Sequence, residues 1–414
     1  MTARKVYVIG AGLAGLAAAV ALAGRGMPVE VIEAAPQAGG RCRSWFDAQI
    51  QDVIDNGNHL VLSGNRATFD YLKTIGAEDR VTGPDEAIFA FCDVRNARRW
   101  TIAPNAGVLP WWILSRARRV PDTLAIDYAK FARLLSRNRG QRVRDVITCE
   151  GPAWDCLMRP LLLAALNTAP EEASAELASA VLRQTLARGG RYCLPRIAWP
   201  NLAAAFVEPA VGYLARKGLR LRLGERLREV GFGGDALSAL DLGESRIELS
   251  ADDRVILAVP PGIATALLPG VAAPDQSSAI VNAHYRARAP ADAPAMMGLV
   301  GGTAEWVFAF PGRISVTVSG ADAIVDRERN DLAEMLWRDV VAAYDLKPDL
   351  PPWQIVKEKR ATFRATPEQA ARRPPAETRW ANLFLAGDWT ATGLPATIEG
   401  AIRSGQTAAQ LVVG

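Results

Sequence analysis

The chain has 414 residues, of which half are apolar and 22% are charged, which excludes a disordered chain and leaves room for two or three domains. Lys and Arg outnumber Asp and Glu by only 48 to 44, so a histone-like protein is excluded and no nucleic-acid partner is expected. The five cysteines are widely spaced and only two histidines are present, His59 and His284. We therefore expect reduced thiols in a cytoplasmic protein, with neither a disulfide framework nor a metal site.

The first 24 residues contain an uncharged stretch, Val6 to Gly24, directly after Arg4 and Lys5. Such a stretch resembles a signal peptide or a single membrane span. The order of residue types favours another interpretation, because a β-branched run, a glycine turn and an Ala-rich segment follow one another. We expect a strand, a tight turn and a helix here.

The turn carries the glycine spacing of a dinucleotide-binding fold. Lys5 to Ile9 is predicted as a buried parallel strand, and Leu16 to Ala23 as a helix. Between them, Gly10 makes the turn, Gly12 lets the backbone approach a pyrophosphate, and Gly15 lets the helix pack on the strand. The helix N-terminus supplies N–H groups and partial positive charge to that pyrophosphate, and Leu13 and Ala14, in the turn before it, are expected to contact the cofactor.

A second predicted strand, Pro28 to Ile32, ends at Glu33 and Ala34, about 20 residues past the turn. A carboxylate at this position can hold both hydroxyls of a ribose, and it argues against the 2′-phosphate of NADP. The alternative is a glycine-rich turn in some other α/β sheet. The register of strand, turn, helix, strand and acid favours the dinucleotide site.

Gly39-Gly40-Arg41 narrows the cofactor to FAD. A glycine pair and an arginine just after the acidic residue resemble the continuation found in flavoproteins of the glutathione-reductase type. In those proteins the backbone and the guanidinium contact the flavin and its phosphates. Arg is also the planar donor that suits a phosphate or a flavin carbonyl.

The C-terminal segment supplies a second part of the predicted site. Leu383 to Ala386 is a short buried strand leading to Gly387 and Asp388, and a helix with small residues begins at Thr397. Asp388 suits a ribityl hydroxyl, and the helix start near Ile398 would point its dipole at the N1–C2=O edge of a flavin. The alternative is a final strand and helix that only cover the core.

Two further segments complete the predicted domains. Leu219 to Phe232 alternates as a half-exposed strand pair would, and Asp253 to Pro261 is a buried strand stopped by prolines. We expect an α/β, Rossmann-like FAD-binding domain of the glutathione-reductase type from residues 1–65, 215–275 and 378–414. Residues 66–214 and 276–377 should form an interleaved α+β substrate-binding domain.

Taken together, these motifs resemble the amine-oxidase and carotenoid-desaturase-like flavoproteins. Within them the chain is most similar to the squalene-associated FAD-dependent desaturase family, whose members are the hydroxysqualene dehydroxylases of bacterial hopanoid synthesis. Besides the motifs above, the resemblance rests on four further segments: Ile54 to His59, Ala164 to Thr168 with Glu171 to Ser174, Lys359 to Phe363, and Ala386 to Gly400.

The resemblance implies non-covalent FAD and the reductive conversion of hydroxysqualene to squalene. The allylic hydroxyl is protonated and leaves as water, and hydride from reduced flavin takes its place. It also implies that Gly57 and Asn58 lie along the isoalloxazine, although Gln is expected at position 58, and that Leu227 lies beside the adenine. The reduction needs an external electron donor, which the sequence does not identify.

Three other functions are compatible with the same predicted fold. Two are enzymatic, a carotenoid-type desaturase and a flavin amine oxidase. The third is a cofactor-free escort protein for prenyl groups, which the intact glycine motif, Glu33 and Asp388 disfavour.

For catalysis, the reaction needs a proton donor near the flavin. His59 is the preferred acid and Asp55 the group that tunes it. The alternative is that His59 packs on the flavin and donates one fixed hydrogen bond. Asn167 and Thr168 are candidates for binding the leaving hydroxyl or the flavin, or else form a polar turn at a helix end.

The positive charge gathers in one segment. Residues 116–142 hold eight basic and two acidic residues, so the rest of the chain has 40 basic against 42 acidic residues. Val108 to Leu114, with Trp111 and Trp112, lies just before this segment. We expect residues 108–142 to contact an anionic membrane surface, at the inner face of the cytoplasmic membrane, where a lipophilic isoprenoid is collected. The alternative is a solvated basic face with two core tryptophans.

Overall fold

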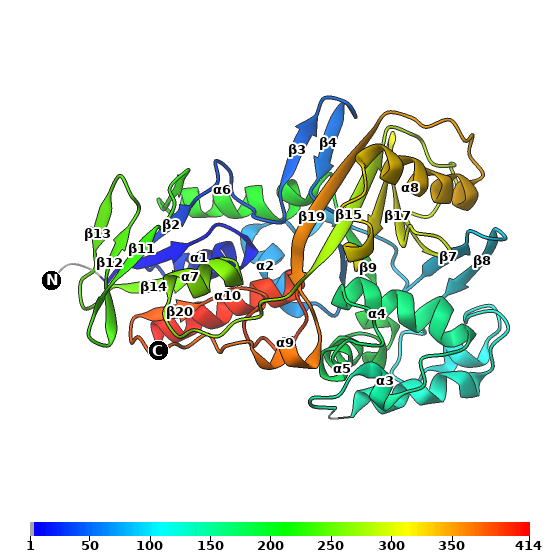
Figure 1. Cartoon of the computed structure of the whole chain (residues 1–414), viewed down its shortest axis with the longest axis horizontal. Coiled ribbons are helices and arrows are strands. Elements are labelled where there is room, and N and C mark those ends of the chain that lie inside the picture. The colour runs from blue at the N-terminus through cyan, green and yellow to red at the C-terminus, as the bar shows by residue number, and fades with distance from the viewer. Residues whose placement is uncertain (1–3, 137) are drawn as a thin grey trace.

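The computed structural model describes residues 4–136 and 138–414. Figure 1 shows two adjoining parts, a parallel sheet with its helices on the left and a larger mixed sheet with further helices on the right. Residue 137, one of the eight basic residues counted above, lies outside the described residues.

The left-hand part contains a five-stranded parallel sheet in the order β10-β2-β1-β14-β20. Its strands are β1 (Val6–Ile9), β2 (Val29–Glu33), β10 (Arg220–Leu223), β14 (Arg254–Leu257) and β20 (Leu383–Leu385). All four residues of β1 are buried, because helices cover both faces of a parallel sheet. The sheet draws its strands from three separated stretches of the chain, and each stretch lies within the segments that the sequence assigns to FAD binding.

Two helices from opposite ends of the chain pack together beside this sheet, α1 (Leu13–Gly24) and α10 (Ile398–Val413). Gly405 makes the approach possible, because a Cβ there would lie 2.0 Å from the carbonyl oxygen of Ala14. The small residues in the C-terminal segment therefore serve helix packing. The left-hand part also contains α2 (Arg66–Ile75), α6 (Glu208–Arg216) and α7 (Pro261–Leu267).

The right-hand part is built on a seven-stranded mixed sheet in the order β19-β15-β18-β17-β16-β7-β8. Its strands are β7 (Phe89–Asp93), β8 (Arg98–Ile102), β15 (Ser277–Tyr285), β16 (Met296–Val300), β17 (Trp306–Phe310), β18 (Arg313–Val318) and β19 (Trp353–Phe363). One face packs on α8 (Arg329–Tyr344) through residues such as Val281 and Val316.

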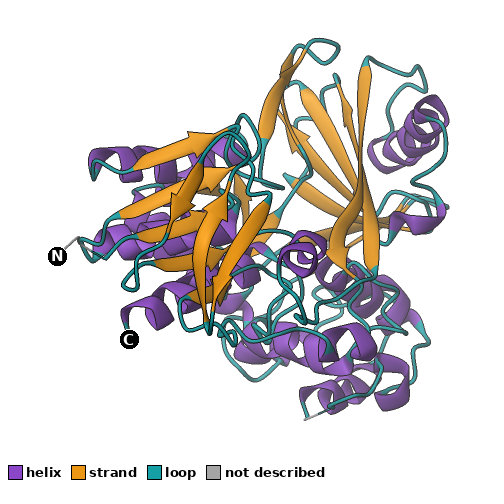
Figure 2. Cartoon of the chain, turned by 60° about the vertical axis from the view of Figure 1, so that its left-hand side comes forward, coloured by secondary structure: helices purple, strands orange, loops and turns teal. Residues whose placement is uncertain are grey.

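The opposite face of this sheet presents large apolar side chains, among them Phe91, Trp306 and Phe308. They belong to one buried cluster with the helical region below the sheet, which is drawn in green in Figure 1. That region includes α3 (Val143–Val146), α4 (Arg159–Leu166) and α5 (Ala175–Gln184). Figure 2 shows these helices beneath the strands of the large sheet.

The remaining strands form three small sheets: β3 (Ser44–Asp47) with β4 (Asp52–Asp55); β5 (Leu60–Leu62), β9 (Pro195–Ala198) and β6 (Val81–Thr82); and β11 (Glu229–Gly233), β12 (Ala236–Asp241) and β13 (Arg246–Glu248). One sequence prediction is wrong here. Leu219 to Phe232 does not form a strand pair, because β10 joins the parallel sheet and β11 pairs with β12.

The α/β fold class and the elements around the glycine turn are confirmed. The strand predicted at Asp253 to Pro261 is β14, and the predicted C-terminal strand and helix are β20 and α10. Among the described residues no helix is long and apolar enough to cross a membrane. The five cysteines form no disulfide with one another, and burial raises the pKa of Cys42 and Cys193 to about 12.

Candidate active site

The three glycines of the turn serve three different geometric needs. Gly10 has a φ of 104°, and a Cβ there would lie 2.4 Å from the carbonyl oxygen of Ala258, which directly follows the neighbouring strand β14. A Cβ at Gly15 would lie 1.8 Å from the carbonyl oxygen of Gly10, so the helix reaches the turn only without a side chain. At Gly12 nothing lies within 4 Å of that position. The space above the start of α1 is therefore open for a phosphate, as the sequence motif requires.

Glu33 lies at the end of β2 and faces the same turn. Its carboxylate accepts hydrogen bonds from the backbone N–H groups of Ala11 at 2.7 Å and Ala35 at 2.8 Å, one on each oxygen. Each oxygen keeps a lone pair for a ribose hydroxyl. The neighbouring Ala34 is exposed.

The loop that follows β10 lies against this end of β2. The N–H groups of Gly224 and Glu225 bond the carbonyls of Ala35 and Glu33, each at 3.0 Å. The same loop contains the buried Leu227, which is predicted to contact the adenine. The acid expected to bind the ribose and the residue expected to contact the adenine are thus held on one side of the turn.

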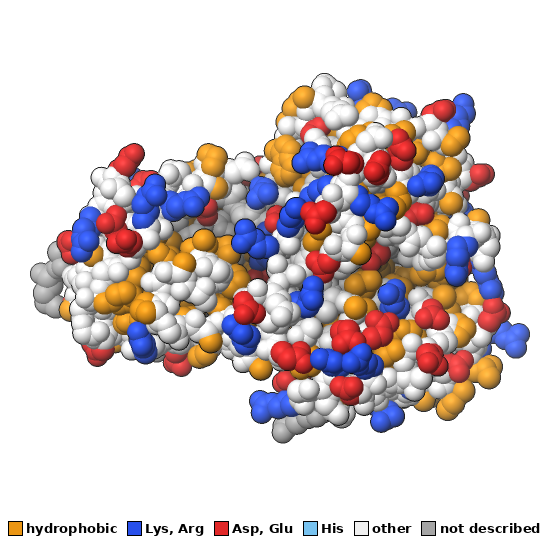
Figure 3. Space-filling model, in the orientation of Figure 1, with side chains coloured by type: hydrophobic (Ala, Val, Ile, Leu, Met, Phe, Trp, Pro, Cys, Tyr) orange, Lys and Arg blue, Asp and Glu red, His pale blue; other side chains and the backbone are white. Residues whose placement is uncertain are grey.

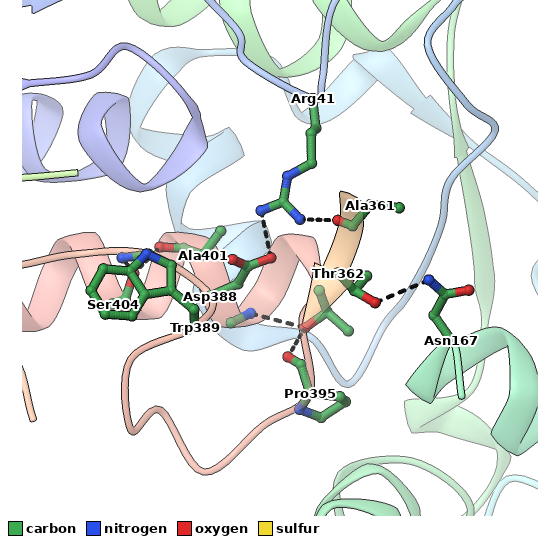
Figure 4. Close-up of polar contacts among 12 residues, drawn as sticks. Arg41, Asn167, Ala361, Thr362, Asp388, Trp389, Pro395, Ala401 and Ser404 are labelled. Carbon is green, nitrogen blue, oxygen red and sulfur yellow. Dashed lines mark hydrogen bonds and ion pairs between the residues drawn. The ribbon is translucent and has the colours of Figure 1, made fainter. Parts of the chain in front are cut away.

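Arg41 joins the first and last FAD motifs. Figure 4 shows its guanidinium between Asp388 and the carbonyl oxygen of Ala361 in β19, and the Nη2–Oδ2 distance to Asp388 is 2.6 Å. The nearby Asp388 carboxylate raises the pKa of Arg41, so the guanidinium is permanently charged. Arg41 follows Gly39 and Gly40, whose φ angles of 114° and 56° are in the range that favours glycine. A Cβ on Gly40 would lie 3.2 Å from the Cα of Gly12.

The second motif, Gly387 and Asp388, is fixed by the end of the parallel sheet and by α10. The N–H of Gly387 donates to Ser404 Oγ at 2.8 Å, and the indole of Trp389 donates to the carbonyl of Val259 at 2.8 Å. Thr397 caps α10 by accepting from the N–H of Gly400 at 3.0 Å, so the helix begins at Ile398, one residue after the predicted start.

The segment predicted to lie along the flavin is held by the large sheet. His284 and Asn282 in β15 bond the backbone carbonyls of Asp55 and Asn56, at 3.0 and 3.2 Å. Gly57 is required beside them, because a Cβ there would lie 2.9 Å from Asn282 Nδ2. This docking brings Gly57, Asn58 and His59 to the junction of the two sheets.

His59 is partly buried, and its environment opposes a positive charge. Desolvation and the nearby charge of Arg41 lower the pKa of His59 to about 4. The imidazole is therefore mainly neutral at neutral pH. A neutral ring can still donate one hydrogen bond.

Asp55 does not tune His59, which corrects the sequence prediction. Its Oδ1 accepts from Ser44 Oγ at 2.5 Å and from the N–H of Leu202 at 2.9 Å, and its backbone carbonyl accepts from His284. Its partners are therefore a hairpin, a helix start and the other histidine. Asp55 is a structural group.

Asn167 and Thr168 use their polar atoms within the protein. Asn167 has a φ of 47° at the end of α4, donates to Thr362 Oγ1 at 3.0 Å, and accepts from the N–H of Gly320 at 2.6 Å. Thr168 Oγ1 accepts from the N–H of Ala365 at 2.8 Å. This arrangement favours the polar turn at a helix end over contact with the substrate.

Sequence reasoning missed three residues that shape the site, Asn282, Thr317 and Arg373. Arg373 is buried, stacks over Phe363, and donates to the carbonyl of Asp388 at 3.0 Å and to Thr392 Oγ1 at 2.8 Å. Lone Asn, Thr and Arg residues carry no local pattern. Only their position on β15, on β18 and beside the loop that follows Asp388 gives them a role.

The residues present fit FAD. The open position above Gly12, the free lone pairs of Glu33, and the charged pair of Arg41 and Asp388 offer donors and acceptors along the path from adenosine to flavin. No group of three or more His, Cys, Asp or Glu side chains that could hold a metal ion occurs in the described parts of the chain. Fold and site together define an FAD-dependent oxidoreductase with a glutathione-reductase-type cofactor domain.

Comparisons with known proteins agree with this class. Residues 13–413 match the family model of flavin containing amine oxidoreductases. The chain is 50% identical over 410 residues to a hydroxysqualene dehydroxylase of Sinorhizobium fredii, covering 99% of this chain and 98% of the relative. It is 51% identical over 411 residues to one of Rhodopseudomonas palustris, with the same coverage. An oxidoreductase structure from Methanosarcina mazei has a TM-score of 0.74 at 17% identity and covers 98% of this chain and 100% of its own.

The chain therefore belongs to the flavin-containing amine oxidoreductases, and within them to the hydroxysqualene dehydroxylase family.

Proposed function

We propose that the protein reduces hydroxysqualene to squalene, with an external donor supplying the electrons. The observation that supports this proposal most is the identity of about half of all residues, over nearly the full length, with relatives that are named for this reaction. In the reaction, a C–O bond is replaced by a C–H bond and water leaves. Reduced FAD supplies the hydride, and the second hydrogen arrives as a proton.

The decisive experiment uses the enzyme with its FAD reduced under anaerobic conditions. On adding hydroxysqualene we expect the flavin to reoxidise while one squalene forms per FAD. If hydroxysqualene does not reoxidise the flavin, and an amine or a polyene instead reduces the FAD of the oxidised enzyme, the result would support an amine oxidase or a desaturase. A colourless, folded preparation that binds no added FAD would contradict every enzymatic assignment.

The remaining FAD contacts are part of the same proposal. Gly10, Gly12, Leu13, Ala14 and Gly15 approach the pyrophosphate; Glu33 and Ala34 lie at the ribose and Leu227 at the adenine. Gly40, Arg41, Gly387, Asp388 and Ile398 lie toward the ribityl chain and the flavin, beside Gly57 and Asn58. The buried apolar side chains on the face of the large sheet opposite α8 would exclude water from the reacting carbon.

For His59 we propose the role of a neutral hydrogen-bond donor to the substrate hydroxyl. This follows from its lowered pKa, because a donor with a pKa of about 4 carries no additional proton at neutral pH. We expect His59→Phe to lower turnover about tenfold or more while FAD content stays unchanged, and His59→Gln, which keeps an N–H donor, to retain more activity. Equal activity in all three proteins would contradict this role.

We further propose that the protein collects its lipophilic substrate at an anionic membrane surface. Six of the thirteen large apolar side chains that are exposed in the described residues lie within 19 positions, and they define an apolar patch: Val108, Leu109, Trp111, Leu114, Leu124 and Ile126. They lie on and around the short helices η2 (Trp111–Leu114) and η3 (Ala125–Leu135). Trp112, by contrast, is buried against Tyr128 and belongs to the core.

Basic side chains flank this apolar patch. Exposed arginines include Arg116 and Arg133 from the same segment, and Arg191 from a distant one, which donates to the carbonyl of Ala106 at 3.1 Å. In Figure 3 hydrophobic and basic side chains lie side by side at the lower right, where the cyan and green segments of Figure 1 run. Apolar insertion combined with positive charge suits an anionic leaflet.

Liposome flotation tests this part of the proposal. We expect binding to vesicles that contain anionic lipid, weaker binding in high salt, and loss of binding in a Trp111→Ser and Ile126→Ser double variant. Phe46→Ser is the matched control, because Phe46 and Trp111 are both 62% exposed but Phe46 lies on the β3–β4 hairpin at the top of Figure 1. Equal flotation of the double variant and the wild type would contradict docking through the apolar patch.

A further inference from the structure

Asn56 and Asn58, in the segment expected to lie along the flavin, are joined by a chain of hydrogen bonds through Asn282 and Thr317. The backbone carbonyl at one end of this chain determines which atom is donor and which is acceptor in every bond. Asn282 Nδ2 donates to the backbone carbonyl of Asn56 at 3.2 Å. A carbonyl only accepts, so the amide of Asn282 is oriented with its Oδ1 toward β18. There Thr317 Oγ1 donates its single proton to Asn282 Oδ1 at 2.8 Å.

This donation determines how Asn58 is oriented. Because the proton of Thr317 is already committed, its oxygen can only accept from Asn58, and Asn58 Nδ2 lies 3.2 Å away. The amide oxygen of Asn58 therefore points away from Thr317. That oxygen is buried and has no hydrogen-bond partner. A buried acceptor without a donor is unfavourable, and it is unusual in folded proteins unless a ligand supplies the donor.

We propose that Asn282 and Thr317 are positioning residues that present Asn58 Oδ1 as a hydrogen-bond acceptor to an N–H or O–H group of a bound ligand. This inference rests on the proposed function, which provides two such donors, an N–H of the flavin and the hydroxyl of the substrate. We call the hydrogen bonds from Asn56 through Asn282 and Thr317 to Asn58 the relay. The relay fixes the orientation of the Asn58 amide, so that its oxygen, and not its NH2 group, faces the ligand. It also accounts for Asn282 and Thr317, which the sequence motifs do not include.

The test compares Thr317→Val, which keeps the shape but removes the hydroxyl, with Thr317→Ser, which keeps the hydroxyl. We expect Thr317→Val and Asn58→Leu to weaken one ligand by about three- to tenfold, as the loss of one neutral hydrogen bond would. Thr317→Ser should restore wild-type values. If the donor is the flavin, FAD affinity or the flavin midpoint potential changes in these variants. If the donor is the substrate, KM for hydroxysqualene rises while FAD affinity and the potential stay constant.

Thr185→Val is the matched control for general effects of a lost buried hydroxyl. Thr185 is buried at the end of α5, and its Oγ1 donates to the carbonyl of Val181 at 2.8 Å, outside the relay. It should leave both ligands unaffected. The proposal is wrong if FAD affinity, flavin potential and KM are all unchanged in Thr317→Val and Asn58→Leu, or if Thr185→Val changes them equally. FAD affinity, measured by fluorescence titration, makes the outcome independent of turnover.

Discussion

At the scale of single residues, Arg41 brings together parts of the chain that are more than 300 positions apart. Its guanidinium contacts Asp388 from the last FAD motif and the backbone of Ala361 from the large sheet. Arg43, two positions further, has looser contacts, 3.4 Å to the carbonyl oxygen of Gly40 and 3.9 Å to Glu358. Although the two arginines are close in sequence, only Arg41 bonds the segment that contains Asp388.

We therefore expect Arg41→Ala to weaken FAD binding by about tenfold or more, because a charge-assisted hydrogen bond is lost and the buried Asp388 is left without its partner. Arg43→Ala should bind FAD as the wild type does. Flavin content after gel filtration and a fluorescence titration measure both. Equal FAD affinity in the two variants would show that the ion pair plays no part in holding the cofactor.

Glu305, just before β17, gives the stability of the protein a pH dependence of its own. Burial raises the pKa of Glu305 to about 7, although its Oε2 accepts from the N–H of Ser319 at 2.7 Å. Because the pKa is higher in the folded chain, the stabilising proton is fully bound below about pH 4.5 and is lost as the pH rises through 7.

Glu305→Gln keeps the acceptor and removes the charge. At pH 8 we expect the free energy of unfolding of this variant to exceed that of the wild type by about 3 kcal/mol, and at pH 5 by about 1 kcal/mol or less. Denaturant unfolding at both pH values measures the difference. A constant difference across this range would contradict the raised pKa.

At the scale of elements, different glycines of the turn serve folding and cofactor binding. Gly12 has an ordinary φ of −71° and open space at its Cβ position, whereas a Cβ at Gly15 would collide with the carbonyl of Gly10. We expect Gly12→Ala to fold normally but to bind FAD about tenfold more weakly or worse, because its methyl group occupies the pyrophosphate position. Gly15→Ala should destabilise the chain by about 3 kcal/mol or prevent folding. Thermal unfolding with and without FAD distinguishes the two effects.

The elements also show what a sequence can predict. The strand–turn–helix at residues 5–24 and the C-terminal strand and helix are readable because their signals are local: glycine spacing, buried runs and small residues. The pairing of β10 and β11 was predicted wrongly, because alternation of apolar residues shows that a strand exists but not which sheet it joins. Likewise, nothing local links Asn58 to Asn282 and Thr317, since their contact depends on how the hairpin after β4 docks on the large sheet.

At the scale of the whole molecule, the cofactor sheet is completed by the end of the chain. β20 pairs with β14, and α10 packs on α1 next to the glycine turn. We expect removal of residues 398–414 to yield a chain that neither binds FAD nor stays soluble. Removal of Val413 and Gly414 alone, which are exposed, should have little effect. Flavin content of the soluble fraction compares the two truncations, and a yellow protein without α10 would contradict this view.

The packing of Gly405 against Ala14 also has a consequence for folding during synthesis. During synthesis the glycine turn leaves the ribosome almost 400 residues before the helix that covers α1. We expect the nascent chain to remain without its cofactor, with the apolar face of α1 uncovered, until residues 398–414 have been made. At a rate of about 5–20 residues per second this interval lasts on the order of 20–80 seconds, long enough for chaperones to control the yield of active enzyme.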